Sequence, residues 1–284
     1  MPNHKKPMRL SVTDLTLELT RRCNMKCPHC LRGDAEDLDM SKQVIENTFS
    51  AMREISTLTF TGGEPSLVPE LMQYALSMAK KYHVRVTEAY LATNGLAISE
   101  KFMAVCRAWH MKCLSDAIPY TDRYVDTDQI RNIIQATKAY EPAGMYIDIS
   151  MDPYHDSIPL DNVLKLCTLP NVRTDKYRPA DDDSWVLHVG RAYWNGIGRD
   201  DTESSRPWAY GEASGTMRIE WNDAIGGAVY DGLLYVNAEG KILKYCDYPY
   251  DDQDEHVMGQ IMTDKLDRGW VQRLYDAHKD DPVC

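Results

Sequence analysis

Three cysteines near the N-terminus are the residues whose types and spacing point most directly to chemistry. Cys23, Cys27 and Cys30 are separated by three and by two residues, so one short loop brings three thiols into a small volume. Thiolates are ligands of zinc and of iron-sulfur clusters, and a closed site of either kind normally takes four ligands. Three thiolates leave one metal position open. We therefore predict a site at which a further molecule binds to the metal.

The residues before the cysteines have the pattern of a β-strand. Residues 15–19 read Leu-Thr-Leu-Glu-Leu, an alternation of apolar and polar side chains that stops just before Cys23. A second short β-type run, residues 57–61, ends at Gly62-Gly63-Glu64-Pro65. Both special sequences therefore follow the end of a predicted strand.

A third predicted strand, residues 84–92, also ends in an unusual loop, Thr93-Asn94-Gly95. Apolar residues at helical spacing separate the strands, in one helix that starts after the N-cap residue type Ser41 and in a second over residues 71–82. Alternating strands and helices predict parallel strands with right-handed crossovers, and ligands of such folds collect at the carboxyl edge. The three loops are thus expected to meet on one face.

The pattern continues less regularly toward residue 180. We predict helices over 99–109, 126–140 and 160–166, strands over 111–117 and 145–152, and a last barrel strand over 172–177. The expected fold is α/β, a partial (β/α)6 TIM-like barrel of about six parallel strands. A small α+β cap follows, giving a barrel domain over residues 1–210 and an extension over 211–284, with a hairpin around Ala238-Glu239-Gly240.

Composition excludes several classes of protein. The chain has 284 residues and a net charge of −11, with 43 acidic against 32 basic residues, which argues against a nucleic-acid partner. No apolar run approaches the roughly 20 residues that span a bilayer, and no signal-peptide pattern follows the basic start. Eight cysteines, three of them within eight residues, indicate a reducing cytoplasm rather than a disulfide framework. Cys106, Cys113 and Cys167 are expected to be buried among apolar residues.

The three motifs together resemble the radical S-adenosylmethionine (SAM) superfamily, over roughly residues 12–195. The resemblance implies one four-iron four-sulfur cluster held by Cys23, Cys27 and Cys30, with SAM chelating the open iron. It also implies a flavodoxin- or ferredoxin-type electron donor, reductive cleavage of SAM to a 5′-deoxyadenosyl radical, and abstraction of hydrogen from an organic substrate.

The resemblance also assigns residues to SAM. It places Gly62, Gly63 and Glu64 at the methionine amine, and Thr93 and Asn94 facing the cofactor. Its further candidates, for the SAM carboxylate or ribose, are Ser150 and Asp152.

One position departs from the usual motif. The superfamily normally has an aromatic ring before the third cysteine, against the adenine, and this chain has His29. The imidazole can pack in the same place, or can tune the cluster through a hydrogen bond. The segment 150–155 followed by Val189-Gly190-Arg191-Ala192 has a weaker similarity to one branch of the superfamily, to which we assign no activity.

The C-terminal hairpin resembles a degenerate copy of the SPASM or twitch extension of peptide-modifying relatives. Only Cys246 and Cys284 follow residue 170, so we expect no auxiliary cluster. Cys246 is a candidate hydrogen-atom donor to a substrate radical, or a packed thiol. His155 is a candidate substrate contact, as is Tyr154, or part of a solvated loop.

Several interpretations of function stay open. The degenerate extension favours a ribosomally made peptide as substrate, modified by epimerisation or cross-linking. A small metabolite is the first alternative, and activation of a glycyl-radical enzyme is another. The non-catalytic alternative is a regulator that holds zinc or a cluster, and it gives no reason for glycine loops at consecutive strand ends.

Overall fold

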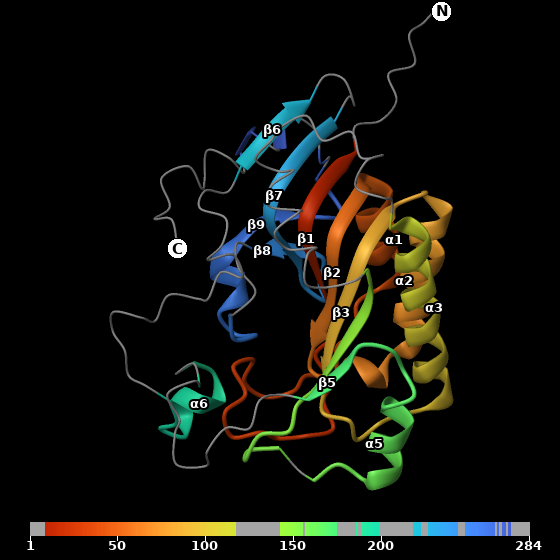
Figure 1. Cartoon of the computed structure of the whole chain (residues 1–284). Coiled ribbons are helices and arrows are strands. Elements are labelled where there is room, and N and C mark those ends of the chain that lie inside the picture. The colour runs from red at the N-terminus through yellow and green to blue at the C-terminus, as the bar shows by residue number, and fades with distance from the viewer. Residues whose placement is uncertain are drawn as a thin grey trace, which may run out of the picture.

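The computed structural model describes residues 9–117, 143–155, 157–174, 186, 189–198, 218–222, 227–243, 248–264, 266, 269–270 and 272–273. Within this part of the chain nine strands form one sheet, with the order β5-β4-β3-β2-β1-β7-β8-β9 and β6 paired to β7 (Figure 1). The predicted helix at 126–140 and the predicted domain boundary at 210–211 lie outside the described residues.

The parallel part of the sheet contains six strands, which confirms the predicted α/β barrel class. They are β1 (Leu10–Thr20), β2 (Met52–Gly62), β3 (Arg85–Thr93), β4 (Gly144–Ile149), β5 (Val172–Thr174) and β7 (Gly227–Val236). The path of the described strands ends at β5 on one side, so the barrel is partial. The carboxyl ends of β1, β2 and β3 lie together, as the sequence pattern predicted.

The sixth parallel strand was not expected where it occurs. We predicted the last barrel strand at residues 172–177, but β7 pairs in parallel with β1, through contacts such as Leu15 with Leu234 and Leu17 with Val236. The predicted strand itself is confirmed as β5, which pairs in parallel with β4. It is not the last parallel strand, because the free edge of β1 takes its hydrogen-bond partners from the C-terminal part of the chain. The predicted hairpin is confirmed as β7 with β8 (Lys241–Leu243), which β9 (Val257–Gln260) extends; β6 is Arg218–Asn222.

Three helices cover one face of the parallel strands, on the right of the view in Figure 1: α1 (Lys42–Ala51), α2 (Pro69–Lys81) and α3 (Glu100–Asp116). The Ser41 side chain accepts a hydrogen bond from the Val44 N–H, which confirms the predicted start of α1. Leu15, Leu17 and Leu19 of β1 are fully buried against this layer. Short helices α5 (Leu160–Leu166), as predicted, and α6 (Arg191–Trp194) lie near the carboxyl ends of the strands, with 3-10 turns at Pro65–Leu67 and Gln253–His256.

The prediction of a strand over residues 111–117 is wrong. Helix α3 continues to Asp116 because Phe102, Cys106, Trp109 and Cys113 recur every three or four residues and are all buried. The Trp109 indole N–H donates to the Met72 carbonyl at 3.1 Å, which fixes α3 against α2. Residues 111–117 taken alone have the appearance of a short strand, and they do not reveal that α3 continues through them. In the described part of the chain no helix has the length and apolarity needed to cross a bilayer.

A buried carboxylate joins β1 to the C-terminal strands. Glu18 is fully buried and accepts from the Tyr235 hydroxyl at 2.6 Å and from the Gln253 amide at 2.8 Å. Arg21 pairs with the same carboxylate at 2.8 Å and donates to Gln253 at 2.7 Å. Burial and the nearby Glu18 charge raise the pKa of Tyr235, which therefore remains a hydrogen-bond donor. The start of the cysteine loop is thus tied to residues more than 200 positions away.

The loop Gly62–Pro65, called the glycine loop below, lies in tight contact with the end of β1 and gives a stability prediction. A Cβ at Gly63 would lie 2.2 Å from the Arg22 carbonyl oxygen, which no side-chain rotation relieves. Gly63→Ala should lower the free energy of unfolding of the apoprotein by about 3 kcal/mol, measured by urea denaturation. Gly196→Ala is the control, because no atom lies within 4 Å of its Cβ and its φ of 64° alone should cost about 1 kcal/mol. Equal losses in the two variants would contradict the steric explanation.

Candidate active site

The cysteine loop directly follows β1 and carries the three thiols that the sequence singled out. Cys23, Cys27 and Cys30 are free and half-buried, and all three line one cavity. The Cys30 N–H donates to the Cys27 carbonyl at 3.2 Å, and the Met25 N–H approaches the Cys23 sulfur at 3.4 Å. Burial raises the pKa of the Cys23 thiol to about 11 and also raises that of Cys30. These thiols therefore hold their protons until a cation displaces them.

The spacing of the sulfurs fits a cluster better than a single ion. Among the described residues, one group of three ligand-type side chains has all its ligand atoms within 4.8 Å of one another, and the three cysteines are not that group. A single tetrahedral zinc, with Zn–S bonds of about 2.3 Å, would draw its sulfurs closer together. A four-iron cluster places each thiolate on a different iron. The donor set therefore suits an iron-sulfur cluster.

A distant segment fixes the backbone of the cysteine loop. The Arg191 N–H, at the start of α6, donates to the Cys30 carbonyl at 2.9 Å, and its guanidinium donates to the Cys27 carbonyl at 3.0 Å and pairs with Asp34. Figure 1 shows α6 beside this loop. Arg191 was not among the predicted site residues. Its only sequence signal was the weak similarity of the run Val189-Gly190-Arg191-Ala192.

Both glycines of the glycine loop are required by close contact with the backbone at the end of β1. A Cβ at Gly62 would lie 1.9 Å from the Thr20 carbonyl oxygen, and Gly62 has a φ of 130°. The Gly63 N–H donates to that same carbonyl at 2.8 Å, and the Glu64 N–H donates to the Arg22 carbonyl at 2.9 Å. The two glycines thus let the loop after β2 lie directly on the end of β1, next to Cys23.

The Glu64 carboxylate connects the second loop to the third. It is 98% buried and accepts from the Ser66 N–H at 2.9 Å, the Thr93 hydroxyl at 2.8 Å and the Asn94 N–H at 2.8 Å. The Asn94 side-chain amide in turn donates to Asn24 in the cysteine loop at 2.8 Å. Gly62, Gly63, Glu64, Thr93 and Asn94, all predicted site residues, therefore meet with the cysteine loop in one cavity.

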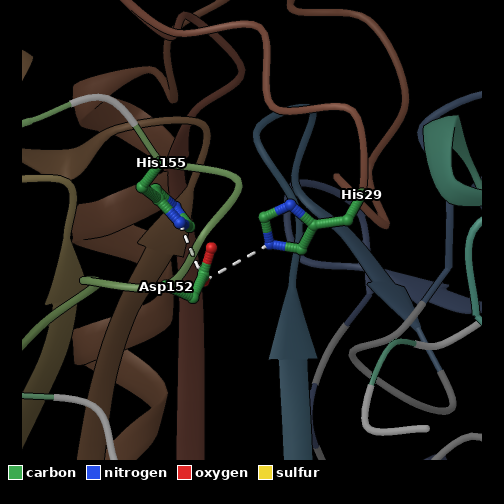
Figure 2. Close-up of side chains that lie close together, drawn as sticks. All are labelled: His29, Asp152 and His155. Atoms are coloured by element: carbon green, nitrogen blue, oxygen red, sulfur yellow. Dashed lines mark ion pairs between the residues drawn. The ribbon is translucent and has the colours of Figure 1, made fainter. Parts of the chain in front are cut away.

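The loop after β4 brings the remaining candidates to the same place. Ser150 lines the cavity, and its N–H donates to the Thr93 carbonyl at 3.0 Å. Asp152 and His155 follow on the turn and face His29 of the cysteine loop, as Figure 2 shows. These three side chains are the group whose ligand atoms lie within 4.8 Å.

Asp152 lies between the two imidazoles. Its Oδ2 is 2.8 Å from His155 Nδ1 and 3.6 Å from His29 Nε2 (Figure 2). Burial opposes charge on both partners, but the mutual contact prevails: the pKa of Asp152 is lowered, and that of His155 is raised to about 10, helped by a hydrogen bond to Cys27. The His29 ring lies 4.9 Å from the Tyr154 ring and 5.1 Å from the His155 ring. The His29 imidazole, directly before Cys30, is thus packed against the rings of Tyr154 and His155.

The cavity has a volume of about 590 Å³ and continues from the cysteines onto the inner face of the sheet. Many residues of that face are of polar types, such as Thr57 and Thr59, because they alternate along the strand with apolar side chains that are buried on the helix side. Asp148 pairs with Arg173 at 2.8 Å and accepts from the Tyr90 hydroxyl at 3.0 Å. Sequence reasoning missed these three residues, whose proximity depends on the register of β3, β4 and β5.

The other cysteines divide into different environments. Cys106 and Cys113 are buried in the core, as predicted. Cys167 is exposed, so the prediction for it is wrong: it follows the end of α5, a helix whose one buried residue is Leu166. The candidate hydrogen-atom donor Cys246 lies outside the described residues.

Comparisons with known proteins agree with the motifs. Residues 17–115 match the family model described as the radical SAM superfamily. The chain is 31% identical over 117 residues to a GTP 3′,8-cyclase of Synechococcus sp. (strain CC9902), covering 40% of this chain and 31% of the relative. It is 25% identical over 174 residues to the GTP 3′,8-cyclase of Mycolicibacterium smegmatis, covering 55% and 47%. The chain thus spans between about a third and a half of the length of these curated relatives.

Solved structures include a more distant likeness. The structure described as native anSMEcpe with bound AdoMet and Cp18Cys peptide has 13% identity and a TM-score of 0.45, over 95% of this chain and 81% of that chain. Residues 17–115, which contain the cysteine, glycine and Thr-Asn-Gly loops, are thus similar to the radical SAM superfamily. This similarity implies a four-iron four-sulfur cluster and SAM as cofactors.

The three hydrogen bonds to Glu64 predict the effect of a conservative change. In Glu64→Gln one carboxylate oxygen becomes an NH2 group that cannot accept from Thr93 or Asn94, so the apoprotein should lose about 2 kcal/mol of unfolding free energy. The loops should also splay, which weakens SAM binding measured by calorimetry.

Glu70→Gln is the matched control for Glu64→Gln. Glu70 makes a surface pair with Lys101 at 3.4 Å, and its loss should cost under about 1 kcal/mol. Equal urea midpoints for Glu64→Gln and the wild type would show that the carboxylate does not join the loops.

Proposed function

We propose that this protein is a radical SAM enzyme with Cys23, Cys27 and Cys30 as the cluster ligands. One observation supports this proposal most strongly. Three half-buried free thiols line the same cavity as the Gly62–Glu64 and Thr93–Asn94 loops. The bound cluster would supply one electron that breaks the C5′–S bond of SAM, giving methionine and a 5′-deoxyadenosyl radical that removes a hydrogen atom from the substrate.

The chain's own residues have separate parts in this proposal. Gly62 and Gly63 set the loop that would face the methionine amine, and Glu64 holds that loop against Thr93 and Asn94. Ser150 and His29 line the cavity, where Ser150 would contact the SAM carboxylate or ribose and His29 would pack beside the adenine. Asp152, the other candidate for these SAM groups, lies behind them, 5% exposed and paired with His155. Arg191 keeps the ligand-bearing backbone in place through the Cys27 and Cys30 carbonyls.

The proposal predicts the effect of removing one thiol. Cys27→Ala should assemble far less iron than the wild type and should release no 5′-deoxyadenosine from SAM after dithionite reduction, because an iron loses its protein ligand. Iron content, the optical spectrum and chromatographic detection of 5′-deoxyadenosine provide the readouts.

Cys167→Ala is the matched control for Cys27→Ala, since Cys167 is an exposed thiol outside the cavity lining. It should behave as the wild type in all three measurements. Loss of iron in Cys27→Ala together with no SAM cleavage by a wild type that holds its cluster would instead favour a metal-binding regulator.

For the substrate we propose a ribosomally made peptide. One polar side chain of this peptide would bind to the inner face of the sheet. Two features support it: the antiparallel pairs β7–β8 and β8–β9, which resemble the SPASM or twitch extension of peptide-modifying enzymes, and the polar set Tyr90, Asp148 and Arg173. A small metabolite is the second candidate, favoured by the names of the curated relatives, which are GTP 3′,8-cyclases.

The two substrate classes are distinguished by stimulation of 5′-deoxyadenosine formation. A synthetic peptide encoded beside the gene should raise the rate at least tenfold above the uncoupled rate, and deuterium from the labelled peptide should appear in 5′-deoxyadenosine. Stimulation by GTP and not by the peptide would overturn the peptide proposal and leave the radical chemistry intact. Asp148→Asn should lower the stimulated rate and leave SAM affinity unchanged.

A further inference from the structure

The segment that contains α6 binds the cysteine loop through its backbone carbonyls (Figure 1). The Arg191 side chain donates to the Cys27 carbonyl at 3.0 Å, and the Arg191 N–H donates to the Cys30 carbonyl at 2.9 Å. The Asn195 side-chain amide donates to the Pro28 carbonyl at 3.0 Å. Arg191 and Cys27 are 164 positions apart in the sequence. The backbone that carries two of the three thiols is therefore fixed from the side of α6.

Gly190 allows this segment to lie directly on the loop. A Cβ at Gly190 would lie 2.3 Å from the Leu31 carbonyl oxygen and 2.8 Å from the Cys30 carbonyl oxygen, and the φ of Gly190 is 55°. Arg191 follows immediately and starts α6. Because the two backbones are in contact, the Arg191 guanidinium is held at a fixed place beside the ligand-bearing loop.

Arg191 brings a positive charge to this loop. A guanidinium is permanently charged in proteins, and the Arg191 side chain is only 21% exposed, so water screens its charge in part. Its ion-pair partner Asp34 has a side chain that is 73% exposed. The positive charge thus lies against the Cys27 carbonyl, and the negative charge lies on the solvent side. The ion pair therefore leaves a net positive potential at the loop.

Charges near an iron-sulfur cluster change its reduction potential, because reduction adds one negative charge to the cluster. A fixed positive charge stabilises the reduced state and raises the potential. A negative charge acts in the opposite direction, and its effect is weaker where water screens it. Arg191 and Asp34 are thus expected to act on a cluster in this loop with opposite signs and unequal strength.

We propose that the charge of Arg191 raises the reduction potential of the cluster and that Asp34 limits this rise. This inference rests on the proposed function and deepens it, since Arg191 is then a positioning residue that also acts through its charge. The two partners of one ion pair give opposite predictions when each charge is removed. A purely structural part of Arg191 gives no reason for such a difference in sign.

The test is a redox titration of the reconstituted protein without substrate, monitored by the EPR signal of the reduced cluster. In Arg191→Gln the reduction equilibrium constant should be at least tenfold smaller, a fall in potential of about 59 mV for one electron. Arg191→Lys keeps the charge and loses the planar fork, so its constant should stay within about threefold of the wild type. In Asp34→Asn, which keeps an oxygen acceptor for Arg191, the constant should rise about threefold.

Arg85→Gln is the matched control for Arg191→Gln. Arg85 forms an ion pair with Glu54 at 3.1 Å and is 38% exposed, but it lies at the start of β3, at the opposite end of that strand from Thr93. Its removal should leave the potential at the wild-type value, because the charge is distant and screened.

Three results would overturn the proposal. The first is an unchanged potential in Arg191→Gln with a full complement of iron. The second is an equal fall in Arg191→Lys and Arg191→Gln, which would assign the effect to geometry instead of charge. The third is a potential in Asp34→Asn that stays constant or falls. This third result also decides the question if Arg191→Gln assembles no cluster, since Asp34 is exposed and its replacement leaves the loop contacts in place.

Failure of this inference can be distinguished from failure of the proposed function. Wild-type iron content in Cys27→Ala would contradict the assignment of the cluster ligands and remove the premise. A normal cluster and normal SAM cleavage by the wild type, with equal potentials in Arg191→Gln, Asp34→Asn and the wild type, would remove only the effect assigned to the ion pair.

Discussion

One buried carboxylate holds together the three loops on which the site depends. Glu64 accepts from Thr93 and Asn94 of the third loop, and Asn94 continues the connection to Asn24 beside the cysteines. Parallel pairing decides where the loops begin, because β1, β2 and β3 end at one edge, but it does not fix how they contact one another. The Gly-Gly-Glu sequence supplies that information: the glycines permit close backbone contact, and the carboxylate satisfies donors of both neighbours.

The two faces of the parallel strands explain why a cavity lies beneath these loops. Leu58 and Phe60 of β2 are buried toward the helices, and Thr57, Thr59 and Thr61 alternate with them and line the cavity. Parallel sheets are usually covered on both faces by apolar layers. Here the inner face carries threonines and charged side chains such as Asp148 and Arg173 and lines a cavity instead, so it stays available to a ligand. The register that aligns Tyr90, Asp148 and Arg173 thereby also defines the surface on which a substrate would be recognised.

Sequence reasoning succeeded where the signal was local. Each of the first three strand ends combines alternation with a distinctive loop within about ten residues, and α1 carries its own cap at Ser41. It failed where contacts are distant. Nothing near Arg191 reveals that its guanidinium reaches the Cys27 carbonyl, and the pairing of β7 with β1 follows from an edge that needs a partner. The buried stripe through Trp109 likewise outweighed the strand-like appearance of residues 111–117.

The C-terminal strands are part of the support of the cysteine loop, which is held on both flanks. Before Cys23, Arg21 is bound by Glu18 and Gln253; after Cys30, the Arg32 guanidinium donates to the Tyr248 carbonyl at 2.9 Å and its own carbonyl accepts from the Tyr250 N–H at 3.0 Å. Without these strands, Glu18 would lose the Tyr235 and Gln253 donors and leave a poorly satisfied carboxylate inside the sheet. The position of the three thiols therefore depends on segments from both ends of the chain, and their geometry is a property of the whole sheet.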